Sequence, residues 1–394
     1  MTELEKKYMH ASLSQDCLRL VFPERISSTN APEIKKEIAA LLSELPHTQL
    51  VANFDGVEYI SSSGLRVILE LIKSEKDFRI VNVGSAVYEI FEMTGFLQMA
   101  DIQKKRRQIS LDGAEEIGWG FTARVYRLTE DSIIKVYRED IPIEDIEGEL
   151  SRAKQAFVAG IPTAISFDIV DVGNSIGVIF ERMDGGTLQS AMLSEPERFE
   201  ELMEQYIAVL LAINSIPVSD ETIPDAKELA LDKLKYLTEE KGLLTPQESE
   251  RMKKFLCSLP DTGTYIHGDC QFKNIMLSGG EPMLIDMDTL SKGSPLFELG
   301  ALYYCYIVFE EVFPGNTESF FDIPAELAER IMKRILSACL PVYSAQPYEQ
   351  AEEKVKLLGW FIFLHFVALY MPEREDGIKK AAEVFRKRLA ELEL

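Results

Sequence analysis

The sequence predicts two domains of different fold class, an α/β domain over residues 1–105 and a larger, two-lobed α+β domain over residues 113–394. The first observation is length, because 394 residues exceed what one compact core usually holds. The second is pattern, since short apolar runs first alternate with amphipathic segments, whereas a β-rich stretch and then long helical segments come later. The third is a basic stretch between the two parts, which we interpret as a linker over residues 106–112.

The composition is that of a globular cytoplasmic protein. Apolar residues make up 46% of the chain and charged residues 27%, so extended disorder is not expected. The five cysteines are scattered and lack CxxC spacing, which favours a reducing compartment over a disulfide framework or a zinc site. The charged start lacks the apolar core of a secretion signal, and the longest apolar run, residues 357–371, is shorter than the roughly 20 residues of a membrane span. We expect no membrane association.

The net charge of −23 is concentrated in the second part of the chain. Residues 1–110 contain 15 acidic and 14 basic side chains, whereas residues 111–394 contain 50 acidic and 28 basic ones. An acidic surface disfavours a nucleic acid partner and attracts cationic molecules. A solvated acidic surface that only aids solubility fits the charge equally well.

The first domain alternates predicted strands and helices. Asn30 is expected to cap a helix through Leu45, because the apolar residues after it recur at helical spacing. The other predicted elements are strands at Leu18–Phe22, Leu50–Phe54 and Arg79–Val83, and a helix at Ser85–Met93. This order is typical of an α/β domain.

Three hydroxyl residues, Ser61, Ser62 and Ser63, stand where a predicted strand ends and an apolar-periodic helix begins at Gly64. Such hydroxyls can cap the exposed backbone N–H groups of the helix. The same position suits an added phosphate, because a helix N-terminus favours negative charge. The residues alone leave both roles open.

Together, the run Gly-Val-Glu-Tyr-Ile-Ser-Ser-Ser-Gly-Leu that ends at Leu65 and the run Phe91–Leu97 resemble the STAS family, the fold of bacterial anti-sigma-factor antagonists. The resemblance covers residues 8–105 and implies a regulatory domain that binds a protein partner. In the family, the phosphorylated hydroxyl lies two residues before the glycine, so the resemblance makes Ser62 the expected phosphorylation site. Ser61 stands where the family usually has an aspartate.

The second domain begins with a predicted β-hairpin whose turn carries Gly118 and Gly120, followed by a β-rich run that contains Lys135. Glycine lets a backbone approach phosphates closely, and a lysine on the next strand can neutralise their oxygens. Gly118, Gly120, Val125 and Lys135 are therefore candidate nucleotide contacts. Ordinary hairpins also contain glycine, and a lone strand lysine often faces water.

Two later segments would complete a nucleotide site. A predicted helix after the lysine carries Glu147 and Glu149, either of which could pair with Lys135. An apolar run reaches Glu181 and Met183 before a glycine-rich bend, and in a kinase-like fold the backbone there would bind adenine.

The most specific pattern is Tyr265-Ile-His-Gly-Asp269-Cys-Gln-Phe-Lys-Asn274, followed by Met283-Leu-Ile-Asp286. An aspartate and an asparagine five positions apart, then an aspartate that ends another apolar strand, is the arrangement that phosphoryl transfer needs. Asp269 would orient and deprotonate an acceptor hydroxyl, while Asn274 and Asp286 would hold Mg²⁺ against the phosphates of ATP. Each residue alone has an ordinary structural explanation, but their shared order and spacing predict a phosphotransferase.

These residues resemble the aminoglycoside phosphotransferase and choline kinase family, whose fold is the two-lobed protein-kinase-like one. The resemblance covers residues 113–394 and implies a small lobe at about 113–185 and a helical large lobe at about 186–394. It favours Glu149 as the partner of the strand lysine. His-Gly-Asp stands where protein kinases have His-Arg-Asp, which points to the small-molecule branch.

Two positions depart from the pattern of that family. Glu298 stands where an aspartate is usual, and Lys273 where a glycine or similar small residue is common. The acceptor contacts are expected from helical segments of the large lobe, in which no motif identifies the substrate.

Three functions remain open from the sequence. The leading hypothesis is an ATP- and Mg²⁺-dependent kinase that phosphorylates a hydroxyl of a small molecule, with a cation favoured by the acidic surface, and that is regulated or docked to a partner by the first domain. The second is a protein kinase that acts on a serine such as Ser62. The third is a non-enzymatic signalling protein that senses nucleotide.

Overall fold

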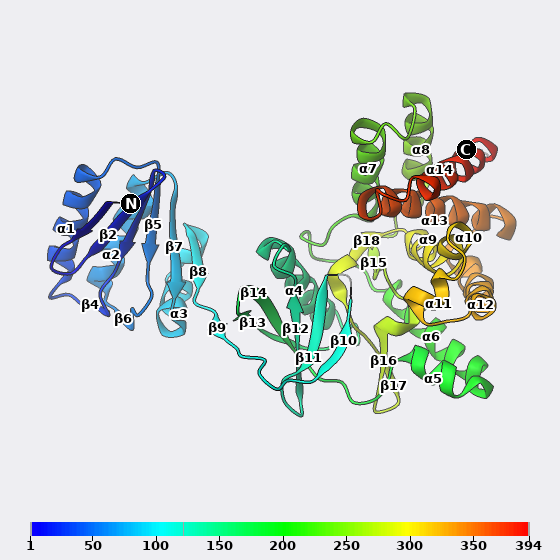
Figure 1. The fold of residues 1–394 in the computed structure, drawn as a ribbon, viewed down its shortest axis with the longest axis horizontal. Helices are drawn as coiled ribbons and strands as arrows, with labels where there is room; N and C mark the ends of the chain where they lie inside the picture. Colours follow the sequence, from blue (N-terminus) through cyan, green and yellow to red (C-terminus); the bar gives the residue numbers. More distant parts are fainter. Residues whose placement is uncertain (1, 121, 393–394) are drawn as a thin grey trace. The chain divides into compact units, whose positions relative to one another are not determined.

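The computed structural model describes residues 2–120 and 122–392 and divides the chain into two compact units. The first unit comprises Met1–Ser110 with Ile169–Gly173, and the second comprises Leu111–Asp168 with Asn174–Leu394. Figure 1 shows the fold of each unit. Within the described residues, no helix combines the length and the apolar character needed to cross a membrane.

A six-stranded sheet in the order β1-β2-β3-β5-β7-β8 forms the first unit (Figure 1). Strands β1, β2 and β3 are antiparallel, whereas β3, β5, β7 and β8 run parallel. Leu18, Leu20 and Ile80 of this sheet are fully buried. The predicted α/β class is confirmed. The elements are β1 (Thr2–Glu5), β2 (His10–Ser14), β3 (Cys17–Val21), β4 (Arg25–Ile26), α1 (Ala31–Glu44), β5 (Gln49–Asn53), β6 (Tyr59–Ile60), α2 (Ser62–Ser74), β7 (Phe78–Val83), α3 (Ser85–Met93), η1 (Phe96–Gln98) and β8 (Asp101–Lys104).

The side chain of Asn30 does not cap α1, so this prediction is wrong. Its backbone angles, φ −103° and ψ −16°, are helical and not the extended ones of a capping residue. The side chain instead closes the preceding turn, where Oδ1 accepts from the Ser27 N–H at 2.8 Å and Nδ2 donates to the Arg25 carbonyl at 2.8 Å. The helix still begins at Ala31.

The start of α2 leaves Ser62 accessible. Ser61 caps the helix, because its hydroxyl accepts from the Gly64 N–H at 3.2 Å. Ser62 is the first helical residue and its side chain is exposed. At Gly64 a Cβ atom would lie 2.9 Å from the Ile26 carbonyl oxygen, so only glycine fits. The hydroxyl that caps the helix is therefore a different one from the hydroxyl that a kinase could reach.

Regular structure extends into the basic stretch that contains the predicted linker. Asp101–Lys104 forms β8, whose Ile102 is buried. Arg107–Gln108 forms β9, which pairs in parallel with β13 (Ser166–Val172). Because Ile102 contributes to the core of the first unit, the charged run does not begin as an extended tether.

The small lobe of the second unit is built on the antiparallel strands β10, β11, β12 and β14. The hairpin places Gly118 opposite Val125 and Val125 opposite Lys135. Helix α4 buries Ile146, Glu149 and Ala153 on one side. Its remaining elements are β10 (Glu116–Trp119), β11 (Ala123–Arg127), β12 (Ser132–Tyr137), α4 (Ile143–Val158) and β14 (Ser175–Glu181).

The large lobe is helical, with two short two-stranded sheets, β15 with β18 and β16 with β17 (Figure 1). The apolar run at residues 357–371 lies on α13 and contributes buried side chains such as Trp360 to the core. The elements are α5 (Leu188–Ser194), η2 (Pro196–Arg198), α6 (Phe199–Ile213), α7 (Ala226–Lys235), η3 (Tyr236–Glu240), α8 (Pro246–Ser258), β15 (Thr264–Ile266), η4 (Phe272–Asn274), β16 (Ile275–Ser278), β17 (Glu281–Leu284), η5 (Met287–Thr289), β18 (Ser291–Gly293), α9 (Leu296–Tyr303), η6 (Tyr304–Val308), α10 (Phe309–Val312), α11 (Asn316–Phe321), α12 (Ala325–Tyr343), α13 (Tyr348–Tyr370) and α14 (Glu375–Glu391).

Candidate active site

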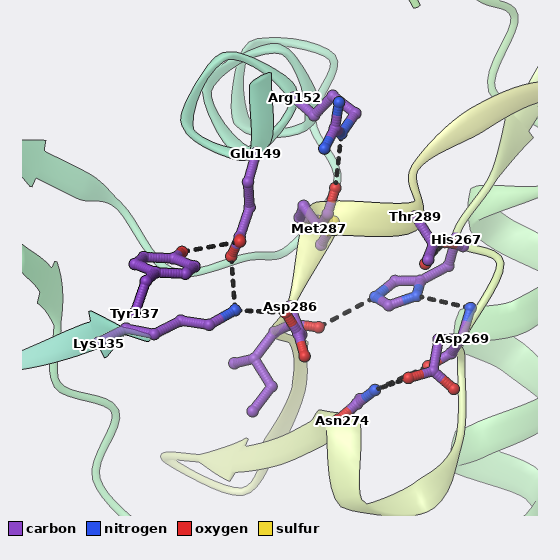
Figure 2. A network of polar contacts seen from close by, with 11 residues as sticks. Lys135, Tyr137, Glu149, Arg152, His267, Asp269, Asn274, Asp286, Met287 and Thr289 are labelled. Carbon is purple, nitrogen blue, oxygen red and sulfur yellow. Dashed lines mark hydrogen bonds and ion pairs between the residues drawn. The ribbon is translucent and has the colours of Figure 1, made fainter. Parts of the chain in front are cut away.

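A lysine held between two carboxylates forms the first part of the site. Lys135 of β12 donates to Glu149 Oε1 and to Asp286 Oδ1, both at 2.7 Å (Figure 2). Tyr137 donates its hydroxyl to the other Glu149 oxygen, also at 2.7 Å. Glu147 is exposed to solvent, so the structure pairs Lys135 with Glu149.

These charges stabilise one another. Burial disfavours the charge on Lys135, but the carboxylates of Asp286 and Glu149 outweigh burial and hold the pKa of Lys135 well above its usual range. Burial likewise disfavours ionisation of Asp286, and the ammonium of Lys135 outweighs it, so the pKa of Asp286 lies below its usual range. At neutral pH the lysine is therefore a cation and Asp286 a carboxylate.

Asp269 lies in the loop after β15 and is held by two amides. Gln271 Nε2 donates to Asp269 Oδ1 at 2.7 Å, and Asn274 Nδ2 donates to Oδ2 at 2.8 Å. Burial raises the pKa of Asp269 to about 6, and the hydrogen bond from Gln271 opposes that rise. A carboxyl with this pKa is largely ionised at neutral pH and remains basic enough to accept a proton from a hydroxyl.

His267 connects the loop of Asp269 to the strand end at Asp286. Its Nε2 lies 3.0 Å from the Ile285 carbonyl oxygen, and its Nδ1 lies 3.3 Å from the Asp269 backbone N–H (Figure 2). A carbonyl can only accept and an N–H can only donate, so the imidazole carries its proton on Nε2 and accepts at Nδ1. This buried ring fixes the spacing between the two aspartates.

The backbone of Asp286 is in the left-handed region, with φ 66°, which is uncommon for a residue other than glycine. Three contacts hold the Asp286 backbone in this conformation. They are the ion pair between Lys135 and the Asp286 side chain, the contact of His267 with the Ile285 carbonyl, and a hydrogen bond to the Met287 carbonyl. In that last contact, Arg152 Nε of α4 donates to the Met287 carbonyl at 3.2 Å (Figure 2). Strained conformations of this kind persist where surrounding contacts over-determine them.

Glu298 of α9 anchors the backbone just before Asp269. Its side chain is fully buried and accepts from the His267 N–H at 2.6 Å and from the Gly268 N–H at 3.1 Å. Gly268 has φ +82°, and a Cβ atom there would lie 2.9 Å from the Thr289 carbonyl oxygen. Glu298, which stands where the family usually has an aspartate, therefore contacts the loop of Asp269 directly.

The predicted adenine-binding segment begins at Glu181, the last residue of β14. Glu181 N–H donates to the Ile165 carbonyl at 2.8 Å and Arg182 N–H to the Asp131 carbonyl at 2.9 Å. Within the described residues, the Met183 N–H has no hydrogen-bond partner. The chain then bends through Gly185, whose φ is +107°, against β16.

Comparison with known proteins adds independent observations. A family model described as the phosphotransferase enzyme family matches residues 113–361. The chain belongs to the phosphotransferase enzyme family. A STAS domain model matches residues 8–109. Over 85 residues, 21% of this chain and 72% of the relative, the chain is 29% identical to the "putative anti-sigma factor antagonist BtrV" of Bordetella bronchiseptica.

Two solved structures are compared with this chain, and the first of them shows the same fold. A thermostable mutant of aminoglycoside phosphotransferase APH(4)-Ia is 12% identical, with a TM-score of 0.50 over 70% of this chain and 94% of that one. The ADP-bound aminoglycoside phosphotransferase APH(2'')-Ib is 15% identical, with a TM-score of 0.47 over 78% of this chain and 98% of that one. The predictions of a STAS domain, a kinase-like fold and an enzyme of the small-molecule kinase class are confirmed.

The side chains of this phosphotransferase fit a divalent cation of the Mg²⁺ type. Asn274 uses its Nδ2 as a donor toward Asp269, which leaves its amide oxygen as an acceptor. The Asp286 side chain is 36% exposed, and only one of its oxygens faces Lys135. One carboxylate and one amide oxygen suit Mg²⁺, which usually keeps water and substrate phosphates as its other ligands. Among described residues there is no group of three or more His, Cys, Asp and Glu that would hold a metal without such help.

Three residues that contact the site were not expected from the sequence. Gln271 lies inside the Asp269–Asn274 motif, Arg152 lies one helical turn after Glu149, and Glu298 was noted only as a departure. The helical spacing of Arg152 and Glu149 could have been read from the sequence, because residues three apart share a helix face. The hydrogen-bond partners of Arg152, Gln271 and Glu298 could not be predicted from the sequence.

Proposed function

We propose that this phosphotransferase uses ATP and Mg²⁺ to phosphorylate a hydroxyl of a small molecule. The observation that carries the proposal is a single polar network that joins Lys135, Asp286, His267 and Asp269. With Asn274, which donates to Asp269, it brings together a lysine cation, two oxygens that could bind Mg²⁺ and a partly buried base, which are the parts that phosphoryl transfer uses.

Each side chain has a role in the proposed reaction. Lys135, held by Glu149, would neutralise phosphate oxygens of the nucleotide, and the free Met183 N–H would donate a hydrogen bond to the adenine edge. Asn274 and Asp286 would hold Mg²⁺, which supplies electrostatic stabilisation of the transferred group. Gly118, Gly120 and Val125 of the hairpin would cover the phosphates with backbone.

Asp269 would orient the acceptor hydroxyl and take its proton as the oxygen attacks the terminal phosphorus of ATP and the bond from that phosphorus to the bridging oxygen breaks, which releases ADP. Two amide donors fix the direction of its carboxylate, so little reorganisation is needed at that moment. The base contributes about 10²- to 10⁴-fold in rate, and positioning and charge stabilisation contribute the rest.

The acceptor class is proposed from charge alone. Residues 111–394 contain 50 acidic and 28 basic side chains, so the surface of the catalytic unit attracts cations. We propose no nucleic acid partner for the same reason. All five cysteines are free, which fits the reducing cytoplasm.

Turnover of ATP by the full chain tests the reaction. Formation of ADP is measured over a panel of amino alcohols, aminoglycosides, sugars and hydroxy acids, for the wild type and for Asp269→Ala. The wild type should exceed the variant by about 10²-fold or more for at least one acceptor. Equal rates for the two proteins over the whole panel would reject the proposal.

For the STAS domain we propose a regulatory or docking role toward a protein partner. The support is the exposed Ser62 hydroxyl at the first residue of α2, where an added phosphate would meet the unpaired N–H groups of the helix. Incubation with ATP and intact-mass measurement, with Ser62→Ala as control, tests whether the chain phosphorylates itself. No added mass on the wild type would remove the protein-kinase alternative.

A further inference from the structure

Lys273 is a cation in the catalytic loop for which the proposed reaction has no use. It belongs to η4, four residues after Asp269 and one before Asn274. Within the described residues its ammonium makes no ion pair or hydrogen bond. Its Nζ lies over the ring of Phe321, 5.3 Å from the ring centroid. Cation–π contacts of partly exposed lysines are weak, so the ammonium stays available to an anion.

The direction of Lys273 distinguishes it from the cation of the nucleotide site. Lys135 comes from the small lobe and points at Asp286, as Figure 2 shows. Lys273 comes from the large lobe and points at Phe321 of α11, another large-lobe element. Phe321 itself is buried, so its ring is a fixed support for the lysine stem. The helical lobe is also where acceptor contacts are expected.

The charge of Lys273 reaches the reacting carboxylates. It is among the positive charges that lower the pKa of Asp269 and the pKa of Asp286, after the larger effect of burial on each. A hydroxyl bound at Asp269 therefore has a fixed cation within electrostatic range. A monoanion suits this position better than a phosphate dianion, because Asp269 and the nucleotide would repel the second charge.

We propose that Lys273 is a specificity-determining residue that binds a carboxylate group of the acceptor, so the substrate is a hydroxy acid or hydroxy amino acid. This inference rests on the proposed function. A hydroxy amino acid also satisfies the acidic surface, since its ammonium is attracted at long range and its carboxylate is recognised by Lys273.

Matched acceptors test this on the full chain with ATP and Mg²⁺. Serine is compared with ethanolamine, and glycerate with glycerol, because each pair differs in the carboxylate. The wild type should prefer the carboxylate-bearing member in kcat/KM. Lys273→Met keeps the apolar stem over Phe321 and should reduce that preference about 10- to 100-fold, Lys273→Arg should keep it, and Lys273→Glu should reverse it. Lys253→Met, at an exposed lysine of α8, is the matched control.

An unchanged preference in Lys273→Met would overturn the inference, as would a wild type that favours the members without carboxylate. If no acceptor is phosphorylated, serine and glycerate are titrated by calorimetry into the chain loaded with Mg²⁺ and ADP. Binding that Lys273→Met loses supports the inference, and equal or absent binding rejects it. Failure of the proposed function is separate, because it appears as ATP turnover no higher than that of Asp269→Ala, and the titration decides Lys273 in that case too.

Discussion

Gln271 should set the pH range in which this phosphotransferase works. Burial raises the pKa of Asp269 to about 6, and the Gln271 amide, 2.7 Å from Oδ1, holds it from rising further. A base must be ionised to act, so the rate should fall as pH drops through about 6 and stay level above it. Gln271→Met removes the donor but keeps an unbranched side chain of similar volume, and the apparent pKa should move upward.

The size of the shift follows from the contact. A hydrogen bond to a charged group contributes about 1.5 to 3 kcal/mol, which corresponds to about one to two pH units. With a pKa of about 6, about nine tenths of Asp269 is ionised at pH 7. After the shift this fraction falls to between about one half and one tenth, so kcat/KM at pH 7 falls about two- to tenfold and recovers near pH 9.

The assay is kcat/KM against pH from 5 to 9, with ATP, Mg²⁺ and any acceptor found active. Gln346→Met, at an exposed glutamine, is the matched control and should reproduce the wild-type profile. Melting temperatures show whether the variant retains the fold. Little stability should be lost, because the Gln271 amide oxygen is buried without a hydrogen-bond partner among the described residues. A variant profile that superimposes on the wild type, or a loss that is equal at every pH, would refute the reasoning.

Three further outcomes are expected. Glu149→Gln removes one of the two carboxylates that pair with the Lys135 ammonium. It should lower kcat/KM for ATP about tenfold or more, measured at a saturating concentration of the acceptor. Arg152→Gln removes the hydrogen bond to the Met287 carbonyl and should raise the Mg²⁺ concentration needed for half-maximal rate. The control Lys154→Gln, on the exposed face of α4, should leave that concentration unchanged. Equal Mg²⁺ dependence of the rate in Arg152→Gln and the wild type would exclude a positioning role for Arg152. Gly185→Ala would place a Cβ atom 2.0 Å from the Leu277 carbonyl oxygen at φ +107°, so thermal unfolding should show a loss of about 2 kcal/mol or more.

The sequence was informative wherever chemistry depends on spacing along the chain. The strands at Leu50 and Arg79 and the helix at Ser85 appear within a residue or two of the predicted bounds, because apolar periodicity reports which face is buried. The order of Lys135, Asp269 and Asp286 likewise predicted residues that the fold brings into one polar network.

What the sequence could not provide were contacts between distant segments. Asn30 was expected to cap α1, but a turn three residues earlier competes for its side chain. Glu149 and Glu147 could be ranked only by resemblance, since the choice depends on how α4 rotates against β12. The Arg152 contact joins residues 135 positions apart, and no local pattern encodes it.

Cys270, which directly follows Asp269, shows how the neighbouring carboxylates affect chemical reactivity. Its thiol is fully buried, and burial, then the charges of Glu298 and Asp269, raise the pKa of Cys270 well above its usual range. Alkylating reagents and mild oxidants attack the thiolate, so they should spare this residue. Cys257 on α8 is exposed. A maleimide-linked fluorophore or spin label should therefore attach at Cys257 and report on the working enzyme without reaching its reactive centre.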